Sequence, residues 1–559
     1  MKLYRNTVKL LLNERREEGL KITFIGGAQS VTGSCFLFEF EGIKFLIDCG
    51  MFQGGLTEEL LNYEAFPFNP SEIEFVILSH AHIDHSGRIP KLYKDGFRGV
   101  IYTTDATMDL CNIMLPDSAH IQESEIEWKN RKRKREGKEQ LKPLYTLEDA
   151  ENVLKHFRGV KYDQKVQINK NLSFVFKDAG HMLGSAIIEL YITEDGKKYK
   201  LVFSGDLGNR NVPILKDPTI IDGCDYLFIE STYGNRFHVD VENKSKKLID
   251  IICTTISNGG KVIIPSFAVG RTQEILYEIA KEIVTHSEKA KVIRDVEIFV
   301  DSPLATSATA IYKKHIEYFD AEAAMFIKNG IYPLEPPNLR FIKSVDESKW
   351  LNEYDKSCII ISSSGMCEAG RIKHHLKHNL WNEKNTVLFV GYQAPNTLGR
   401  KLLDGQKKVK IFGEEVEVKA KIEYIEAYSG HADKGGLFSW IEHMSEKPKK
   451  IFVVHGEKEV QLEFAEELKN RFGADVIVPA RGEMYEIGPE YVLSKERLFS
   501  ELPSFINLSI LAQIEDIEYE LHRLKEGIKN SAISSERLLV LNSNLEELRY
   551  LLNLALNDY

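Results

Sequence analysis

Several features are absent from this sequence of 559 residues, and each absence narrows the class of protein. No apolar run reaches the ~18 residues that a membrane-spanning helix requires, so no transmembrane segment is expected. The seven cysteines form no Cys-x-x-Cys pair, which excludes a zinc ribbon and gives no sign of a disulfide framework. Scattered thiols of this kind are typical of a cytosolic protein. Residues 1–20 combine a short apolar stretch with several charges, which predicts an amphipathic helix and not a signal peptide.

The chain also lacks the positive charge of a protein that coats nucleic acid, because its formal net charge is −10. One segment departs from this balance. Residues 129–135 read Lys-Asn-Arg-Lys-Arg-Lys-Arg and are followed by Lys138. Such a run is most often a solvated face of a helix or loop. It could also guide a polyanion, and the sequence leaves both interpretations open.

The length predicts two or three domains, since one core rarely serves so long a chain. In the first part, short apolar strands are punctuated by glycine-containing turns, and residues 104–160 look mainly helical. This pattern favours an α/β or layered αββα architecture. Strands are expected at residues 22–25, 35–40, 44–47, 75–78, 172–176, 186–192 and 200–204.

From about residue 235, strands alternate with helices, which predicts a second domain with a doubly wound parallel sheet. The β-rich character returns after about residue 420, and a strand at 451–455 ends on a histidine. Helices are expected at 248–256 and 272–284, and strands at 261–265, 297–300, 358–361 and 386–390.

The last segment differs from both domains. Apolar residues recur at alternating steps of four and three over residues 510–528, and a second set spans 538–552. This spacing predicts two helices with heptad-like seams. They could form a hairpin that packs on the body of the same chain, or they could pair with a second copy in a homodimer. The sequence does not decide between these two interpretations.

Three histidines and an aspartate fall within six positions, as His80, His82, Asp84 and His85. They follow the predicted strand at 75–78, so a loop leaving that strand can aim His80 and His82 toward one point. A turn after His82 lets Asp84 and His85 face a neighbouring point. Imidazole nitrogens suit zinc, and a carboxylate can complete or bridge a site. The run therefore predicts a metal centre.

Two metals need more ligands than this run supplies. Further candidates are His181, in Asp178-Ala179-Gly180-His181, together with Asp206 and His455. Each lies just past an apolar strand and beside a glycine, where a strand end would present a ligand at the edge of a sheet. Each is weak evidence alone, but together with the histidine run they predict a dinuclear site.

These motifs resemble those of the metallo-β-lactamase superfamily, specifically its β-CASP branch of nucleic-acid-processing nucleases. The likeness covers roughly residues 20–490. The resemblance implies an α/β chain: an αββα metallo-β-lactamase fold with an inserted doubly wound, parallel-sheet β-CASP domain and a C-terminal helical extension. The matching residues are Asp48 in Phe-Leu-Ile-Asp-Cys-Gly, His80, His82, Asp84, His85, His181 and Asp206, and the β-CASP markers Glu230, His431 and His455.

On this basis the chain is divided into five parts. The metallo-β-lactamase domain is expected in two pieces, because the β-CASP domain interrupts it. The expected parts are an N-terminal helix at 1–20, the metallo-β-lactamase domain at 21–232 and 421–500, the β-CASP domain at 233–420, and a C-terminal helical hairpin at 501–559.

Within the branch, the run His-Ala-His-Ile-Asp-His-Ser-Gly at 80–87 looks like the nuclease subunit of the cleavage and polyadenylation specificity factor and its bacterial and archaeal relatives. It is less like RNase J. A histidine at the last motif, here His455, is typical of members that act on RNA, whereas DNA-acting relatives such as Artemis usually carry valine. No KH-like module precedes the catalytic domain, unlike in many archaeal relatives. The resemblance implies a cytoplasmic, metal-dependent ribonuclease of RNA processing or decay. It implies endonuclease activity and leaves 5′–3′ exonuclease activity open.

The resemblance also implies two zinc ions per chain, with manganese as the alternative. One ion would be held by His80, His82 and His181, the other by Asp84, His85 and His455, and Asp206 would bridge them. Asp48 is expected to orient the ligand histidines. His431, oriented by Glu230, is expected to act as a general acid. The predicted catalytic residues are Asp48, Asp84, Glu230 and His431.

The inserted domain is expected to hold the RNA backbone. A serine-rich loop follows the strand at 358–361 and precedes a helix expected to begin near Ala369. Exposed amides and hydroxyls in such a loop can hold a phosphate, although glycine-rich loops are often only turns. Phosphate contacts are predicted at Ser363, Ser364, Gly365, Arg271, Arg371 and Arg400, and the basic residues of 129–138 are further candidates.

Three other functions are compatible with part of this pattern. A hydrolase of small esters or lactones uses the same kind of metal site, but a small substrate would not need the inserted domain. A DNA nuclease would share the domain, but His455 favours RNA. A catalytically silent subunit would require lost ligands, and none of the motif positions is lost.

Overall fold

The computed structural model describes residues 19–498 except 136, 240–242, 395, 427 and 496, together with four isolated positions beyond 520. The chain divides into two units, residues 1–499 and 500–559. The following description concerns the first unit. Apart from those four positions, the predicted C-terminal hairpin at 501–559 lies outside the described residues. The same holds for the predicted N-terminal helix, except that its last residue, Leu20, already begins a strand.

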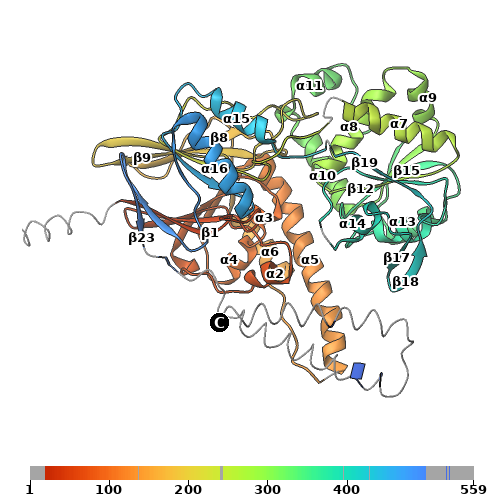
Figure 1. Ribbon diagram of the computed structural model, residues 1–559, viewed down its shortest axis with the longest axis horizontal. Helices are drawn as coiled ribbons and strands as arrows, with labels where there is room; N and C mark the ends of the chain where they lie inside the picture. The colour runs from red at the N-terminus through yellow and green to blue at the C-terminus, as the bar shows by residue number, and fades with distance from the viewer. Residues whose placement is uncertain are drawn as a thin grey trace, which may run out of the picture. The chain divides into compact units, whose positions relative to one another are not determined.

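Two β-sheets face each other and form a sandwich (Figure 1). In the first sheet the strand order is β23 (Val492–Lys495), β22 (Met484–Ile487), β1 (Leu20–Gly26), β2 (Cys35–Phe40), β3 (Ile43–Ile47), β4 (Ile73–Ile77), β5 (Val100–Thr104) and β6 (Phe157–Val160). In the second sheet it is β21 (Asp475–Ile477), β20 (Lys450–Val454), β11 (Tyr226–Glu230), β10 (Lys197–Phe203), β9 (Ala186–Glu194), β8 (Leu172–Asp178) and β7 (Val166–Gln167).

Phenylalanine rings fill the space between the two sheets. On the first sheet, the rings of Phe38 and Phe45 are stacked with centroids 4.9 Å apart. On the second sheet, the Phe203 and Phe228 rings are stacked at 4.1 Å. Phe38 meets Phe203 edge-on at 5.5 Å and so joins the sheets. Because side chains alternate along a strand, these apolar positions point inward and build one core.

Helices cover the outer face of each sheet and complete the αββα arrangement that the sequence predicted. Buried residues of the first sheet pack with α3 (Ile83–Ser86), α4 (Ile89–Lys94), α5 (Asp105–Arg135) and α6 (Leu147–Val153). Those of the second sheet pack with α15 (Lys434–Glu442) and α16 (Lys458–Phe472). The short α2 spans Leu56–Leu61. The stretch expected to be helical at 104–160 ends in strand β6, because Phe157–Val160 pairs in parallel with β5.

A third sheet lies between helices on both faces, and all its pairs are parallel, so the doubly wound sheet is confirmed. Its order is β14 (Leu339–Phe341), β13 (Glu297–Val300), β15 (Cys358–Ser362), β12 (Val262–Pro265), β16 (Thr386–Phe389) and β19 (Lys421–Tyr424). The helices and the small hairpin around it are α7 (Lys244–Ser257), α8 (Arg271–Ile283), α9 (Glu288–Arg294), α10 (Pro303–Lys314), α11 (Ala321–Lys328), α12 (Val345–Glu353), α13 (Ile372–Asn379), α14 (Leu398–Leu403), β17 (Lys408–Ile411) and β18 (Glu414–Glu417).

The third sheet is inserted between two neighbouring strands of the sandwich. Strands β11 and β20 pair in parallel, with Glu230 opposite Val454, although the whole third sheet separates them in sequence. The chain therefore leaves the sandwich after β11 and returns beside the same strand. The domain boundaries at 232 and 420 stay a prediction. None of the helices in the described part of the chain is long and apolar enough to cross a membrane.

Candidate metal centre

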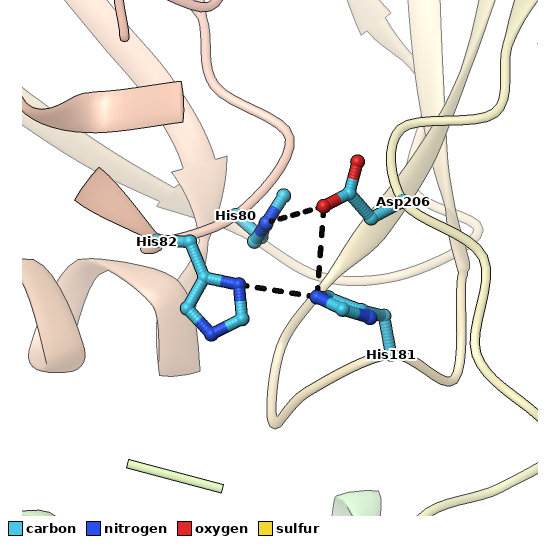
Figure 2. Close-up of side chains that lie close together, drawn as sticks. All are labelled: His80, His82, His181 and Asp206. Atoms are coloured by element: carbon cyan, nitrogen blue, oxygen red, sulfur yellow. Dashed lines mark hydrogen bonds and ion pairs between the residues drawn. The ribbon is translucent and has the colours of Figure 1, made fainter. Parts of the chain in front are cut away.

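A first group of candidate ligands gathers at the ends of strands β4, β8 and β10. It consists of His80, His82, His181 and Asp206, whose ligand atoms all lie within 4.8 Å of one another. His80 Nε2 lies 3.4 Å and His181 Nε2 3.6 Å from Asp206 Oδ2, and His82 Nδ1 lies 3.1 Å from His181 Nε2. Figure 2 shows these side chains facing one another from three separate loops. Such convergence of nitrogen and oxygen atoms suits a single cation.

A second group adjoins the first and shares one of its residues. Asp84, His85, Asp206 and His455 also place their ligand atoms within 4.8 Å of one another. His85 Nε2 lies 3.1 Å from His455 Nε2 and 3.2 Å from Asp206 Oδ1. His455 Nε2 lies 3.5 Å from Asp84 Oδ2. Asp206 thus turns one oxygen toward each group, and its carboxylate could bridge two cations.

The polar atoms at the centre of the two groups are buried without hydrogen-bond partners among the described residues. These atoms are His80 Nε2 and both carboxylate oxygens of Asp206. Burying a carboxylate in this way is costly unless a charge compensates it. A donor set of imidazole nitrogens and carboxylate oxygens suits zinc or manganese. The residues therefore fit a pair of divalent cations.

Partners on the far side of the rings set the direction of the ligand nitrogens. His85 Nδ1 lies 2.7 Å from Asp48 Oδ2. Asp48 in turn accepts hydrogen bonds from the Ser79 amide, at 2.7 Å, and the Ser79 hydroxyl, at 2.8 Å. A carboxylate here keeps the proton on Nδ1 and leaves Nε2 for a cation. The structure therefore places Asp48 behind the candidate ligands and not among them.

Two further partners come from distant parts of the chain, and the sequence did not point to them. His181 Nδ1 lies 2.9 Å from the carbonyl oxygen of Gly430, and His455 Nδ1 lies 3.1 Å from Thr232 Oγ1. Thr232 follows the predicted residue Glu230 by two positions, which is the one signal that could have drawn attention to it. A backbone carbonyl such as that of Gly430 leaves no signal in residue type.

The segment after Asp48 must approach the histidine run very closely. A Cβ atom on Gly50 would lie 1.6 Å from the carbonyl oxygen of Asp84, so the position requires glycine. The same carbonyl accepts a hydrogen bond from Ser34 N at 2.9 Å, and Gly50 N donates to Ser34 O at 2.8 Å. These contacts hold the turn that directs the Asp84 side chain toward the other members of the second group.

The electrostatics of the first ligand group match the protonation states that metal binding needs, whereas in the second group Asp206 and Asp48 outweigh burial and raise the pKa of His85 well above its usual value. Burial lowers the pKa of His80 and lowers the pKa of His82 to about 3, so both rings are neutral. A neutral imidazole is the form that ligates a metal. Burial alone would raise the pKa of Asp206, but the surrounding histidines outweigh it and hold this pKa well below its usual value. Asp206 is therefore an anion.

A third group lies next to the first two. His431 Nδ1 lies 3.2 Å from Glu230 Oε1 and 3.9 Å from Asp206 Oδ2. Glu230 is fully buried and accepts hydrogen bonds from the amides of Leu207, at 2.8 Å, and Thr232, at 3.2 Å. Burial disfavours a charged ring, but Glu230 and Asp206 outweigh it and raise the pKa of His431 to about 9. The side chain is 22% exposed, so a substrate can reach it.

The six predicted phosphate contacts lie on a loop of the third sheet and on the helices α8 and α14, and they mostly engage protein groups. Arg371 pairs with Asp301 at 2.6 Å, Arg400 with Asp404 at 2.9 Å, and Arg271 with Glu274. The hydroxyl of Ser363 meets Ser302 Oγ at 3.1 Å, and that of Ser364 meets Ala369 O at 3.3 Å. The expected helix near 369 begins at Ile372, so the serine loop with Gly365 is not its first turn. These phosphate contacts stay a prediction.

Asp178, at the end of β8, allows a prediction about stability. Burial raises its pKa to about 7, although Gly180 N donates to its carboxylate at 2.9 Å. The folded state thus keeps the proton to higher pH than the unfolded state, which releases it near pH 4. This contribution to stability is complete below pH 4 and is lost as pH rises to 7. We expect Asp178→Asn to raise the free energy of unfolding at pH 8 by about 1–2 kcal/mol.

Urea titrations at pH 5 and pH 8 measure this effect. The stabilisation by Asp178→Asn should be present at pH 8 and should shrink toward pH 5. The exposed Asp195→Asn is the matched control and should change neither value. Equal stability of wild type and Asp178→Asn at pH 8 would contradict the prediction.

Three family models match three successive parts of the chain. The model described as "Metallo-beta-lactamase superfamily domain" matches residues 37–216, and the "Beta-Casp domain" matches 272–402. The "Zn-dependent metallo-hydrolase RNA specificity domain" matches 415–479. An αββα sandwich with histidine and aspartate clusters at its strand ends, together with these matches, defines a metallo-hydrolase, a class that binds divalent metal.

Curated relatives narrow this class. The chain is 36% identical to the ribonuclease TTHA0252 of Thermus thermophilus over 83% of this chain and 99% of that protein. It is 35% identical to an RNase J-like protein of Methanocaldococcus jannaschii over 83% of this chain and 99% of that protein. It is 32% identical to the transcription termination factor FttA of the same archaeon over 83% of this chain and 71% of that protein. The chain belongs to the metallo-β-lactamase superfamily, in its β-CASP branch.

Proposed function

We propose that this protein is a metal-dependent ribonuclease that hydrolyses phosphodiester bonds of RNA in RNA processing or decay. The observation that carries the proposal is the pair of ligand groups joined by Asp206 in a chain of the β-CASP family. The relatives named as ribonuclease and RNase J-like support RNA as the substrate. The proposal includes endonucleolytic cleavage, and RNAs with different 5′ ends decide whether 5′–3′ exonucleolytic cleavage accompanies it.

His80, His82 and His181 would hold one cation, Asp84, His85 and His455 would hold the other, and Asp206 would contact both. We propose zinc for both positions because five of the seven side chains offer imidazole nitrogen. Manganese is the alternative, since the carboxylates of Asp84 and Asp206 also suit it. When bound, such a pair supplies Lewis acidity, which offsets the charge of the phosphate oxygens and increases the acidity of water.

The protein groups supply orientation and the transfer of a proton. Asp48 fixes the His85 ring through its Nδ1 atom, and Glu230 fixes the His431 ring in the same way. The departing ribose 3′-oxygen is a poor leaving group unless it gains a proton. His431 is the proposed donor, because its ring lies beside Asp206 and is partly exposed. Asp48 and Glu230 are positioning residues in this mechanism.

We propose RNA as the substrate in place of two other substrate classes. A small ester or lactone would leave the third sheet and its loops without a role. A DNA substrate is disfavoured because His455, and not valine, occupies the last motif and joins the second ligand group. The loop that carries Ser363 and Arg371, together with Arg400 of helix α14, is proposed to contact the RNA backbone. The cytoplasm is the proposed location, and pairing through residues 501–559 stays a prediction.

Removal of the metals tests the proposal. Wild-type protein is expected to cleave labelled RNAs and to contain two zinc ions per chain by elemental analysis. Dialysis against a chelator should abolish cleavage, and zinc should restore it, because the ligand groups cannot act without cations. Substrates with 5′-triphosphate, 5′-monophosphate and 5′-hydroxyl ends, followed by product mapping, distinguish endonuclease from 5′–3′ exonuclease action.

Two outcomes would overturn this assignment. Turnover of a small ester by metal-loaded protein that leaves every RNA intact would indicate the small-substrate hydrolase. Faster cleavage of a DNA of the same sequence and length than of the RNA would indicate a DNA nuclease. Recovery of activity with manganese but not with zinc would correct the identity of the metal and leave the ribonuclease proposal standing.

A further inference from the structure

Helix α5 begins beside the metal centre and is anchored there. The hydroxyls of Thr104 and Thr107 donate to the carbonyl oxygen of Gly184, at 2.7 and 2.8 Å, three residues after His181. One turn later, Asp109 Oδ2 lies 2.6 Å from Nε2 of His315. The start of α5 therefore has a fixed position relative to the candidate ligands.

The far part of α5 carries the basic run that the metal centre does not use. The helix continues to Arg135, and Figure 1 shows it as one long orange ribbon. Its last buried residue is Ile126. Lys132 lies 25 residues beyond Thr107, which corresponds to about 38 Å at 1.5 Å per residue.

The two faces of this far part differ. On the inner face, the side chain of Asn130 exchanges two hydrogen bonds with the backbone of Leu141, at 2.9 and 2.8 Å. Arg133 Nε donates to the carbonyl oxygen of Glu139 at 2.6 Å. The segment after the helix thus runs back along the inner face and covers it. Lys134 follows Asn130 by one turn and lies on this same side, whereas Lys132 and Arg135 lie on the opposite side of the helix.

The outer face combines large apolar groups with cations. Ile121 and Trp128 are 44% and 68% exposed, and Lys132 and Arg135 follow at helical spacing on the same side. One exposed carboxylate, Glu125, lies between Ile121 and Trp128 in this row. Lys129 flanks this row and is also exposed. A solvated helix face would need charges but no exposed tryptophan. An indole next to several cations is the combination with which proteins hold single-stranded nucleic acid, through base stacking and phosphate contacts.

We propose that the outer face of α5, formed by Trp128, Lys129, Lys132 and Arg135, is a second RNA-binding surface remote from the metal centre. It would hold the strand beyond the cleavage point, and this inference rests on the proposed ribonuclease function. Residues 129–138 carry a net charge of +6 in a chain of −10, so a polyanion is drawn to this face. Stacking on Trp128 is independent of base identity, so binding would be insensitive to sequence.

The distance along α5 sets a length requirement for the RNA. A stacked strand advances ~3.4 Å per nucleotide, so about 11 nucleotides are needed to span the ~38 Å of α5 between Thr107 and Lys132. A six-nucleotide RNA cannot occupy both places, whereas a 30-nucleotide RNA can. The surface should therefore affect KM for the long RNA alone and leave kcat unchanged.

Steady-state kinetics test this length requirement. The zinc-loaded full chain is assayed with unstructured RNAs of 6 and 30 nucleotides between 50 and 200 mM salt. The triple variant Lys129→Ala, Lys132→Ala, Arg135→Ala should raise KM for the 30-mer about 10–100-fold. It should also reduce the slope of log KM against log salt by about 2, because each lost phosphate contact removes ~0.7. Trp128→Ala should raise KM for the 30-mer about fivefold or more without changing that slope.

The matched control removes three exposed lysines from another part of the chain, with Lys343→Ala, Lys349→Ala and Lys356→Ala. It should leave KM and the salt slope of both RNAs unchanged. An unchanged 30-mer KM in the α5 triple variant would overturn the inference, as would an equal effect on the 6-mer. Loss of binding to phosphatidylserine vesicles, with RNA kinetics intact, would assign the face to a membrane instead. If wild type cleaves neither RNA, the proposed function fails as well.

Discussion

Replacing His82 with alanine is expected to reduce RNA cleavage by more than about a hundredfold. His82 Nδ1 faces His181 Nε2 at 3.1 Å, and the two nitrogens belong to the same ligand group. Removing a residue that hydrogen-bonds to a metal ligand already lowers metal affinity or activity roughly 10–100-fold, so removing a ligand itself should lower them further. Elemental analysis should find about one zinc ion per chain where wild type holds two. Single-turnover cleavage of a labelled RNA measures the rate.

The control for this experiment is His443→Ala. His443 follows α15 and is exposed. Within the described part of the chain, its side chain has hydrogen-bond contacts only with Ser439. Its removal should change neither metal content nor rate. Full RNA cleavage by His82→Ala would exclude the proposed metal mechanism. Melting curves of both variants should match wild type within a few degrees when metal is absent, since His82 carries no packing role in the core.

Replacing His431 with glutamine is expected to slow RNA cleavage by about 10²–10⁴-fold, the usual contribution of a general acid. Both zinc ions should remain bound, because His431 is a member of neither ligand group, although its ring packs against that of His181 with centroids 4.5 Å apart. Bis(p-nitrophenyl) phosphate releases a phenolate that needs no proton. The same variant should therefore lose far less activity on this diester than on RNA.

The comparison of the two substrates separates proton donation from a structural role. Glu230→Gln keeps a side chain of the same size beside His431 and should give a smaller loss on RNA, about tenfold, with the same preference for the nitrophenyl diester. If His431→Gln slowed both substrates equally, His431 would act by holding the site together and not by giving a proton. Loss of zinc in that variant would lead to the same conclusion.

The family, the fold class and the class of reaction could be predicted because their signals are local in the sequence. The run from His80 to His85 lies on one loop, and the candidates His181, Asp206 and His455 each follow an apolar strand. Strand ends meet at the edge of a sheet, so the structure brings all of these side chains together. The roles of the individual residues stay predictions, to be decided by variants such as His82→Ala.

Contacts that depend on distant or backbone atoms could not be predicted. The Gly430 carbonyl, which holds the ring of His181, is 249 residues away and depends on how the chain returns from the third sheet. Arg371 could be recognised as a cation, but its pairing with the buried Asp301 depends on two neighbouring parallel strands. Short elements were also missed. Strand β6 exists through pairing with β5, since its four residues have no periodicity of their own.

The position of the third sheet between β11 and β20 has a consequence for how the enzyme is made. His455 leaves the ribosome 225 residues after Glu230, about 10–45 s later at ~5–20 residues per second. Until then the second sheet lacks strands β20 and β21, and the second ligand group lacks one of its members. On the proposed mechanism, a nascent chain cannot cleave the message from which it is being translated, because activity begins when synthesis of the sandwich is nearly complete.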